Sequence, residues 1–208
     1  MQLLTEDNFD RADNADLGTN WDLVNSLTTW KILSNHAEPS NPVATDNIEV
    51  INTPKIPIDQ FASANLTVVS TDTAGAGVGL VLRGITSATT LYRCVISHGA
   101  TTNTRISRYN AGAGTVLVTT NIASWTDGDR FLFTIQTTGA NARLALYRNG
   151  VEVASVIDTS PLLTGAPGLV LSTNVTSAQA DNFQAGSMES SAYITTRFPG
   201  NRAVLRRA

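Results

Sequence analysis

The 208-residue sequence contains few of the side chains that bind metals and nucleic acids: it has one Cys, two His and 15% charged residues. A single Cys excludes an internal disulfide and any zinc site that needs several cysteines. Only two of the fourteen basic residues are Lys, and the net charge is −3. We therefore expect no nucleic-acid partner, because phosphate binding needs clustered Lys and Arg. No run of about 20 apolar residues is present, so no membrane span is expected.

Charge is distributed unevenly along the chain. The opening, Met-Gln-Leu-Leu-Thr-Glu-Asp, is acidic where a secretory signal is basic and then continuously apolar, so we expect no export by that route. Residues 1–186 hold ten basic and sixteen acidic side chains, whereas residues 187–208 hold four Arg and one Glu. The sequence thus predicts two parts, an acidic folded body (1–186) and a basic C-terminal arm (187–208).

The spacing of residues in the body favours strands. Thr is frequent and often paired, while Lys and Glu, which usually cover helix surfaces, are scarce. Apolar side chains alternate at Phe131, Phe133 and Ile135, a period of two that places them on one face of a sheet. Asn149-Gly150 is typical of a type I′ hairpin turn. Further strands are expected at 65–71, 77–84 and 89–98. About a dozen strands without a convincing helix predict an all-β, antiparallel two-sheet sandwich.

The opening also carries a motif, Asp7-Asn8-Phe9-Asp10-Arg11-Ala12-Asp13, followed by Leu17-Gly18-Thr19-Asn20-Trp21. It resembles the start of laminin-G-like members of the concanavalin A-like lectin and glucanase superfamily. Three later segments fit the same family in order: Trp30-Lys31-Ile32, the hairpin at 146–153, and 167–171 followed by Asp181-Asn182-Phe183. The resemblance implies a jelly roll whose first and last strands lie side by side, with the two Asp-Asn-Phe triplets as neighbours.

Catalytic residues of the superfamily's glucanases are not expected here. Those enzymes carry two Glu on one strand in an E-x-D-x-(x)-E pattern, which sets nucleophile and acid about 5 Å apart. The chain has five Glu, and no two share a strand at that spacing: Glu6, Glu38, Glu49, Glu152 and Glu189. The two His and Cys94 are interpreted as turn, strand-end and buried residues rather than members of a triad. We therefore expect a protein that is not an enzyme.

Two kinds of ligand remain as hypotheses. Many relatives hold calcium with loop carboxylates, and Asp7, Asp10 and Asp13 offer hard oxygen ligands, although turn caps and an Arg–Asp pair explain the same residues. No other cofactor is expected. A glycan-binding face needs an exposed aromatic ring with polar neighbours, with burial of each aromatic as the alternative. The residues assigned to this face are Trp125, Tyr92, Arg108 and Tyr109.

The basic arm has two interpretations: a neighbouring subunit holds it, or it folds back on its own sandwich. Its residues assigned to assembly are Tyr193, Arg197, Phe198, Arg202, Leu205, Arg206 and Arg207. A lectin-like sandwich with such an arm resembles virion proteins of tailed bacteriophages. The resemblance implies a homo-oligomeric capsid decoration or tail-associated protein, assembled in the host cytoplasm, with other virion subunits as partners and a cell-surface glycan as a further ligand. A free carbohydrate-binding protein and a degenerate hydrolase are the alternatives.

Overall fold

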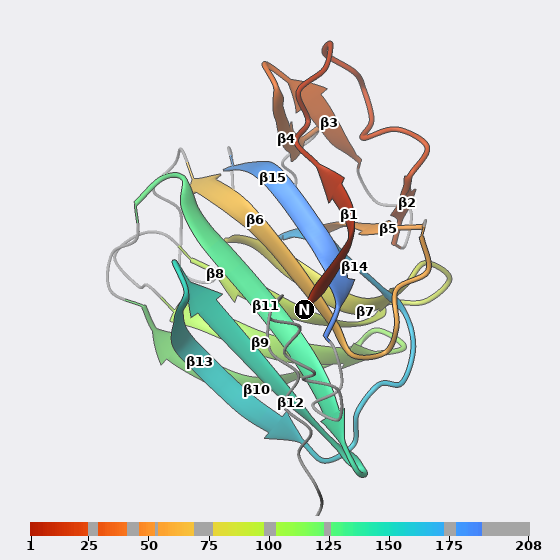
Figure 1. Ribbon diagram of the computed structural model, residues 1–208, viewed down its shortest axis with the longest axis vertical. Coiled ribbons are helices and arrows are strands. Elements are labelled where there is room, and N and C mark those ends of the chain that lie inside the picture. The colour runs from red at the N-terminus through yellow and green to blue at the C-terminus, as the bar shows by residue number, and fades with distance from the viewer. Residues whose placement is uncertain are drawn as a thin grey trace, which may run out of the picture.

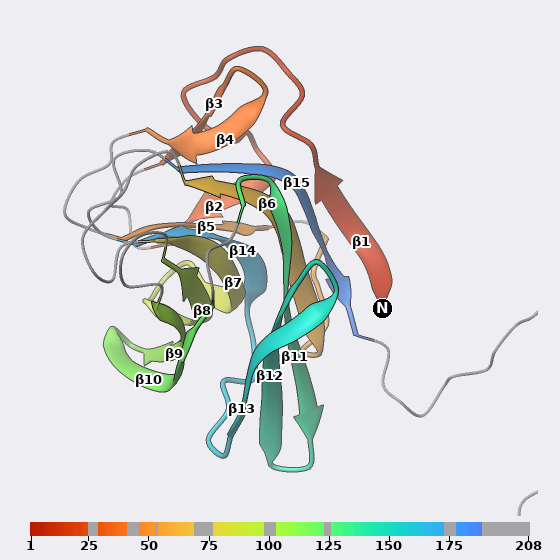
Figure 2. The ribbon, with the colours of Figure 1, turned by 90° about the vertical axis from the view of Figure 1, so that its left-hand side faces the viewer.

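The computed structural model describes residues 1–24, 29–40, 46–52, 54–68, 77–97, 103–122, 126–172 and 178–188. These ranges contain fifteen β-strands and no helix. The strands form two antiparallel sheets that face each other, which Figure 2 shows from the side. The predicted all-β, two-sheet sandwich is therefore confirmed. Within the described residues, nothing resembles a membrane-spanning helix.

The first sheet, sheet A, contains eight strands, and its order continues from one edge to the other as follows: β13 (Val151–Asp158), β12 (Asn141–Arg148), β11 (Asp129–Thr138), β6 (Gln60–Val68), β15 (Ala178–Ser187), β4 (His36–Pro39) and β3 (Trp30–Leu33), with β1 (Gln2–Asp7) also paired to β15. Sheet B contains seven strands in this order: β10 (Ala113–Asn121), β9 (Asn103–Asn110), β8 (Thr90–Ile96), β7 (Val78–Ile85), β14 (Ala166–Leu171), β5 (Asn47–Ile51) and β2 (Trp21–Leu23).

One apolar core fills the space between the two sheets. Phe131, Phe133 and Ile135 are all completely buried there, as their alternation along the sequence predicted. Removal of this apolar surface from water is the main force that holds the layers together. A second buried cluster, which includes Val81 and Val170, contains the residues that alternate with the core positions of sheet B. The middle of sheet B is thus buried on both faces.

Local sequence signals located several strands correctly. Asn149 and Gly150 have φ values of 48° and 83°, so the hairpin between β12 and β13 has the two left-handed residues of a type I′ turn. Strands β7 and β8 match the predicted ranges 77–84 and 89–98 to within two residues at each end. Strand β6 begins five residues before the predicted start at residue 65.

The two ends of the sandwich meet in sheet A. Strand β1 lies beside β15 (Figure 1) and pairs with it antiparallel. In this ladder Asp7 lies opposite Phe183. The ladder joins segments that are about 180 residues apart, a long-range closure that local propensity does not indicate. The expected neighbourhood of the two Asp-Asn-Phe triplets is therefore confirmed.

Candidate functional site

The Asp7 carboxylate is a structural hub at the junction of β1 and β15. Its Oδ1 accepts the backbone N–H of Phe9 at 2.9 Å and Arg11 Nη1 at 2.6 Å. Its Oδ2 accepts Arg11 Nη2 at 3.1 Å and the indole Nε1 of Trp21 at 3.0 Å. Charge-assisted bonds of this kind are stronger than neutral ones. The first half of the opening motif therefore fixes Trp21 rather than presenting a carboxylate to solvent.

Three aromatic rings pack behind this hub. The ring of Trp21 lies between Phe9, at a centroid distance of 6.0 Å, and Phe183, at 4.9 Å in an edge-on arrangement. Phe9 is completely buried and has a φ of 54°, which is unusual for a bulky residue. The Asp7 bond to the Phe9 N–H holds this turn. Both Asp-Asn-Phe triplets thus supply a buried ring to one stack, which explains the motif as structure.

The hydrogen bonds of this hub also occupy one of the predicted calcium ligands. Both oxygens of Asp7 already accept N–H donors. Asp13 accepts the backbone N–H of Ser34 at 2.8 Å, and Asp10 is exposed. No three His, Cys, Asp or Glu side chains in the described ranges are grouped to hold a metal ion. Asp7, Asp10 and Asp13 therefore do not form the calcium site that the sequence suggested, because Asp7 and Asp13 already accept hydrogen bonds within the fold.

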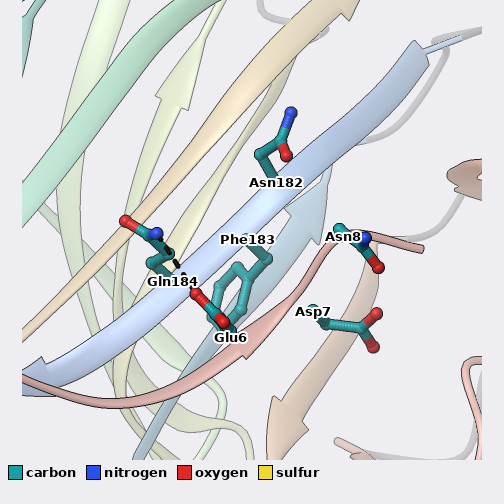
Figure 3. Close-up of a pocket in the computed structure, with 6 residues that line it drawn as sticks. All are labelled: Glu6, Asp7, Asn8, Asn182, Phe183 and Gln184. Atoms are coloured by element: carbon teal, nitrogen blue, oxygen red, sulfur yellow. Dashed lines mark hydrogen bonds between the residues drawn. The ribbon is translucent and has the colours of Figure 1, made fainter. Parts of the chain in front are cut away.

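A polar cavity of about 480 Å³ opens beside the two triplets, between Glu6, Asn8, Asn182 and Gln184 (Figure 3). Its side chains bond mostly to their neighbours. Gln184 Nε2 donates to Glu6 at 3.5 Å, and Asn8 accepts the N–H of Asp10 at 3.2 Å. The Asn182 amide donates to Asp181 at 3.0 Å. Phe183 is fully buried at its base, so this cavity presents no aromatic face to a ligand.

The structure contradicts the predicted glycan-binding role of Tyr92, and it pairs Arg108, the cross-strand neighbour of Tyr92, with Asp158. Tyr92 is completely buried; its hydroxyl donates to Asp158 at 2.6 Å and accepts the N–H of Leu162 at 2.9 Å. Arg108 Nη1 donates to both oxygens of Asp158, at 2.7 and 2.9 Å, and to the Ser160 carbonyl at 2.7 Å. These residues form a latch that ties the end of β13 to β8 and β9. A buried ring cannot stack on a sugar.

Tyr109 pairs with Leu91, the residue before Tyr92, and packs with it in the second buried cluster. Because successive residues of a strand point to opposite faces, Tyr109 and Tyr92 lie on opposite faces of sheet B. The Arg93 guanidinium covers the Tyr109 ring at 4.5 Å, and Arg93 Nη2 donates to the Tyr109 hydroxyl at 2.5 Å. Tyr92 and Tyr109 therefore do not share a binding face. Trp125 and the seven arm residues assigned to assembly lie outside the described residues.

A different groove, of about 580 Å³, lies beside the edge strand β2; we refer to it as the β2 groove. Its exposed polar residues are Asp22, Lys55, Thr86 and Thr164, together with the half-buried Asn52. Its buried lining residues include Val50 and Gly84. A Cβ on Gly84 would meet Val50 Cγ1 at 2.6 Å, so glycine is required for this close packing.

Within the β2 groove, Asn52 orients Asp22. Asn52 Nδ2 donates to Asp22 Oδ1 at 2.9 Å and to the Thr19 carbonyl at 3.0 Å, while its backbone N–H donates to the Asn20 carbonyl at 2.9 Å. The exposed Asp22 carboxylate is thus held in one place by a fixed amide. A positioned acceptor, a nearby ammonium on Lys55 and an apolar base are suited to a polyhydroxylated ligand, whose hydroxyls donate and accept while its C–H surface packs.

A second cavity, of about 460 Å³, also contacts Asp22 and reaches the buried Glu49; we call it the Glu49 pocket. Glu49 is 3% exposed, and its Oε1 accepts the backbone N–H of Trp30 at 2.8 Å. Burial raises the pKa of Glu49 to about 7; the Trp30 N–H opposes this shift, and the charges of Asp16 and Asp22 add to it. Asp16 accepts the N–H of Gly18 at 2.9 Å.

Sequence reasoning missed the β2 groove because its residues meet only through pairing of distant strands. Asp22 lies 30 residues from Asn52, and the β2–β5 ladder that joins them is three residue pairs long. Glu49 was recognised only as one of five scattered Glu. A polar residue alternating with Ile48 and Val50 was the single available signal of a carboxyl inside the sandwich.

The two sheets, their strand order and the pairing of the first and last strands define a concanavalin A-like jelly roll. No family model matches the sequence, and no curated protein matches it. Among solved structures, the GH43 protein BlXynB from Bacillus licheniformis matches with a TM-score of 0.60 and 14% identity, over 88% of this chain and 39% of that one. The chain thus spans about two fifths of the BlXynB protein.

Two other similar structures match over most of both chains. The VIP36 exoplasmic/lumenal domain, in its Ca²⁺/Man3GlcNAc-bound form, has a TM-score of 0.59 and 8% identity, over 91% of this chain and 93% of that domain. The CBM2 module of the evolved Dit of Lactobacillus casei BL23 phage J-1 has a TM-score of 0.50 and 12% identity, over 88% and 94%. At these identities the likeness establishes the fold, and function needs argument from the site.

Proposed function

We propose that this chain is a non-enzymatic virion protein of a tailed phage, a module that docks on a larger assembly and binds a glycan. The β2 groove carries the glycan-binding part of the proposal: Asn52 holds an exposed Asp22 carboxylate beside an apolar base. Similarity to the glycan-bound VIP36 domain supports a sugar ligand, and similarity to the phage J-1 module supports the phage setting.

The contacts of the Glu side chains support a non-enzymatic role. Glu38 pairs with Lys31 at 3.0 Å, and Glu152 pairs with Arg143 at 2.7 Å. Burial raises the pKa of Glu49 to about 7, which would suit acid catalysis, but its Oε1 accepts the Trp30 N–H. Asp22 pairs with Val50, the residue after Glu49, so the two carboxyls leave the β2–β5 ladder on opposite faces. That geometry does not place them on either side of one glycosidic bond.

A glycan array followed by calorimetry on the best binder tests the groove. We expect Asp22→Ala and Asn52→Ala each to weaken binding by at least about ten-fold, since each removes a charged or orienting hydrogen bond worth roughly 1.5–3 kcal/mol. Asp10→Ala, which removes an exposed carboxylate outside the groove, is the matched control. If the array shows no binder, or if both groove variants bind as the wild type does, the groove is not a glycan site.

Docking on an assembly needs a separate measurement. We expect the full chain to sediment with phage particles and a chain without residues 187–208 to remain in the supernatant. Unchanged occupancy of the shortened chain would contradict the role of the arm. A wild-type chain that binds glycan but never sediments with particles would favour the alternative, a free carbohydrate-binding protein. Prolonged incubation of the purified chain with the bound glycan should yield no cleavage product.

A further inference from the structure

The outer strand β10 differs from the other sheet edges of the molecule. An edge strand exposes unpaired backbone N–H and C=O groups, and natural proteins protect such edges with charges, proline or very short strands. Strand β10 is nine residues long, Ala113–Asn121, and has none of these protections. Residues 109–126 contain no charged side chain and no Pro.

The remaining described edges are protected. Strands β2 and β3 are three and four residues long, and each carries a charge, at Asp22 and Lys31. Strand β1 ends in Glu6 and Asp7. Strand β13, the edge of sheet A beside β10, carries the exposed Glu152. Both long edges, β10 and β13, contain one register shift in their ladders, so a bulge does not distinguish them.

Strand β10 is also accessible. Residues Ala113 to Val116, Thr119 and Asn121 are exposed, and Val116 is 55% exposed. Leu117 and Val118 pack against the main core, which keeps the strand in place. The strand is thus held against the core and rich in β-branched residues, and none of the described strands pairs with its outer side.

We infer that β10 pairs antiparallel with β10 of a second copy of this chain, which joins the two B sheets into one continuous sheet. A two-fold antiparallel pairing is self-complementary: residue i of one copy meets residue j of the other, and j meets i. Like charges directly opposite each other destabilise such a pair, and β10 has none. The same strand offers no charge by which a different partner would be selected.

The pairing has a consequence for the proposed glycan site, and this step alone rests on the proposed function. Strands β10 and β2 are the two opposite edges of sheet B. A dimer through β10 therefore leaves both β2 grooves open, one at each end of the joined sheet. Two glycan sites on one dimer raise its apparent affinity for a surface that displays many copies of a glycan.

Sedimentation velocity on the full chain, without any glycan, tests the pairing independently of the groove. We expect a concentration-dependent dimer, and at least about a ten-fold rise in the dimer dissociation constant for Val116→Lys and for Val116→Glu. Val116 is 55% exposed and lies opposite the uncharged Ser107 on β9, so we expect the monomer to tolerate either charge. Val151→Lys, at a site 67% exposed in the β12–β13 hairpin, is the control and should dimerise as the wild type does.

A mixture of the two charged variants separates loss of pairing from loss of folding. Because the centre of a two-fold antiparallel pair brings the 116 positions close together, equal amounts of Val116→Lys and Val116→Glu should restore the dimer as a mixed species. Amide hydrogen exchange across 113–121 should also slow as the wild-type concentration rises. A wild-type chain that is monomeric at all concentrations, or a dimer that both charged variants leave intact, would overturn the inference.

Discussion

The indole N–H of Trp21 donates to the carboxylate of Asp7 at 3.0 Å, and this bond joins the start of sheet B to the first strand of sheet A. Trp21 is 7% exposed and carries the ring that packs between Phe9 and Phe183. One carboxylate thus sets the position of an aromatic ring that contacts both Asp-Asn-Phe triplets. The opening motif is explained by this contact, which links both termini of the jelly roll.

Replacement of Asp7 by Ala should lower the free energy of unfolding by roughly 3 kcal/mol, because it leaves the Trp21 indole and the Phe9 N–H without an acceptor and removes the ionic partner of Arg11. Urea unfolding followed by Trp fluorescence measures the change. Asp10→Ala removes an exposed carboxylate of the same motif and should leave the midpoint unchanged. Equal effects of the two substitutions would contradict the hub.

Calcium should not stabilise the folded chain through these aspartates. A ligand that binds only the native state raises the melting temperature, by an amount that grows with the logarithm of its free concentration once this exceeds the Kd. The Asp7 oxygens already accept four N–H donors, so a cation there would have to displace them. We expect identical melting temperatures in millimolar calcium chloride and in EDTA at matched ionic strength. If calcium raised the melting temperature of the wild type, and Asp7→Ala abolished that increase, the calcium hypothesis would be restored.

What was predictable from sequence was local or carried by a family resemblance. The Asn149-Gly150 turn depends on two adjacent residues, and the structure has its φ values as expected. Tyr92 shows the limit: alternation places it on one face of a strand but does not say whether that face is covered. Its hydroxyl donates to Asp158, which is 66 residues away in the sequence, so its burial depends on a contact between distant strands. The β2 groove depends in the same way on the pairing of β2 with β5.

The Tyr92–Asp158 latch predicts a structural rather than a binding phenotype. Tyr92→Phe keeps the buried ring and removes the hydroxyl that bonds Asp158 and the Leu162 N–H. We expect a loss of roughly 1–3 kcal/mol in unfolding free energy, since Asp158 and an N–H lose a partner. Affinity for any glycan found on the array should not change. A selective loss of glycan binding with unchanged stability would return Tyr92 to the binding face.

The latch also adds a dependence on acid. Burial by itself raises the pKa of Asp158, but hydrogen bonds from Tyr92, the Ser160 N–H and Arg108 outweigh burial and hold the pKa below its ordinary value. The stability that comes from this ionised carboxylate is present above the ordinary Asp pKa and is lost as pH falls through the lower folded pKa. The wild type should therefore exceed Tyr92→Phe in unfolding free energy by less at low pH than at neutral pH. Urea unfolding of both proteins from pH 6 to pH 3 measures this difference.

Glu49 predicts the opposite dependence on pH. Burial raises its pKa from an ordinary 4.5 to about 7. The Trp30 N–H opposes this shift, and the charges of Asp16 and Asp22 add to it. Because the folded state holds the proton more tightly than the unfolded state, the unfolding free energy falls as pH rises from 4.5 to 7 and levels off above 7. At about 1.4 kcal/mol per pH unit, the ionised Glu49 costs roughly 3 kcal/mol at alkaline pH.

Glu49→Gln removes this cost and keeps the oxygen that accepts the Trp30 N–H. We expect the variant to match the wild type near pH 4 and to exceed it by up to roughly 3 kcal/mol at pH 8 in paired urea titrations. Glu38→Gln is the control, because it breaks the 3.0 Å pair with Lys31 on the adjacent strand and should bring no gain at high pH. A Glu49→Gln curve parallel to the wild type from pH 4 to pH 8 would mean that Glu49 is solvated and ionises normally in the folded chain.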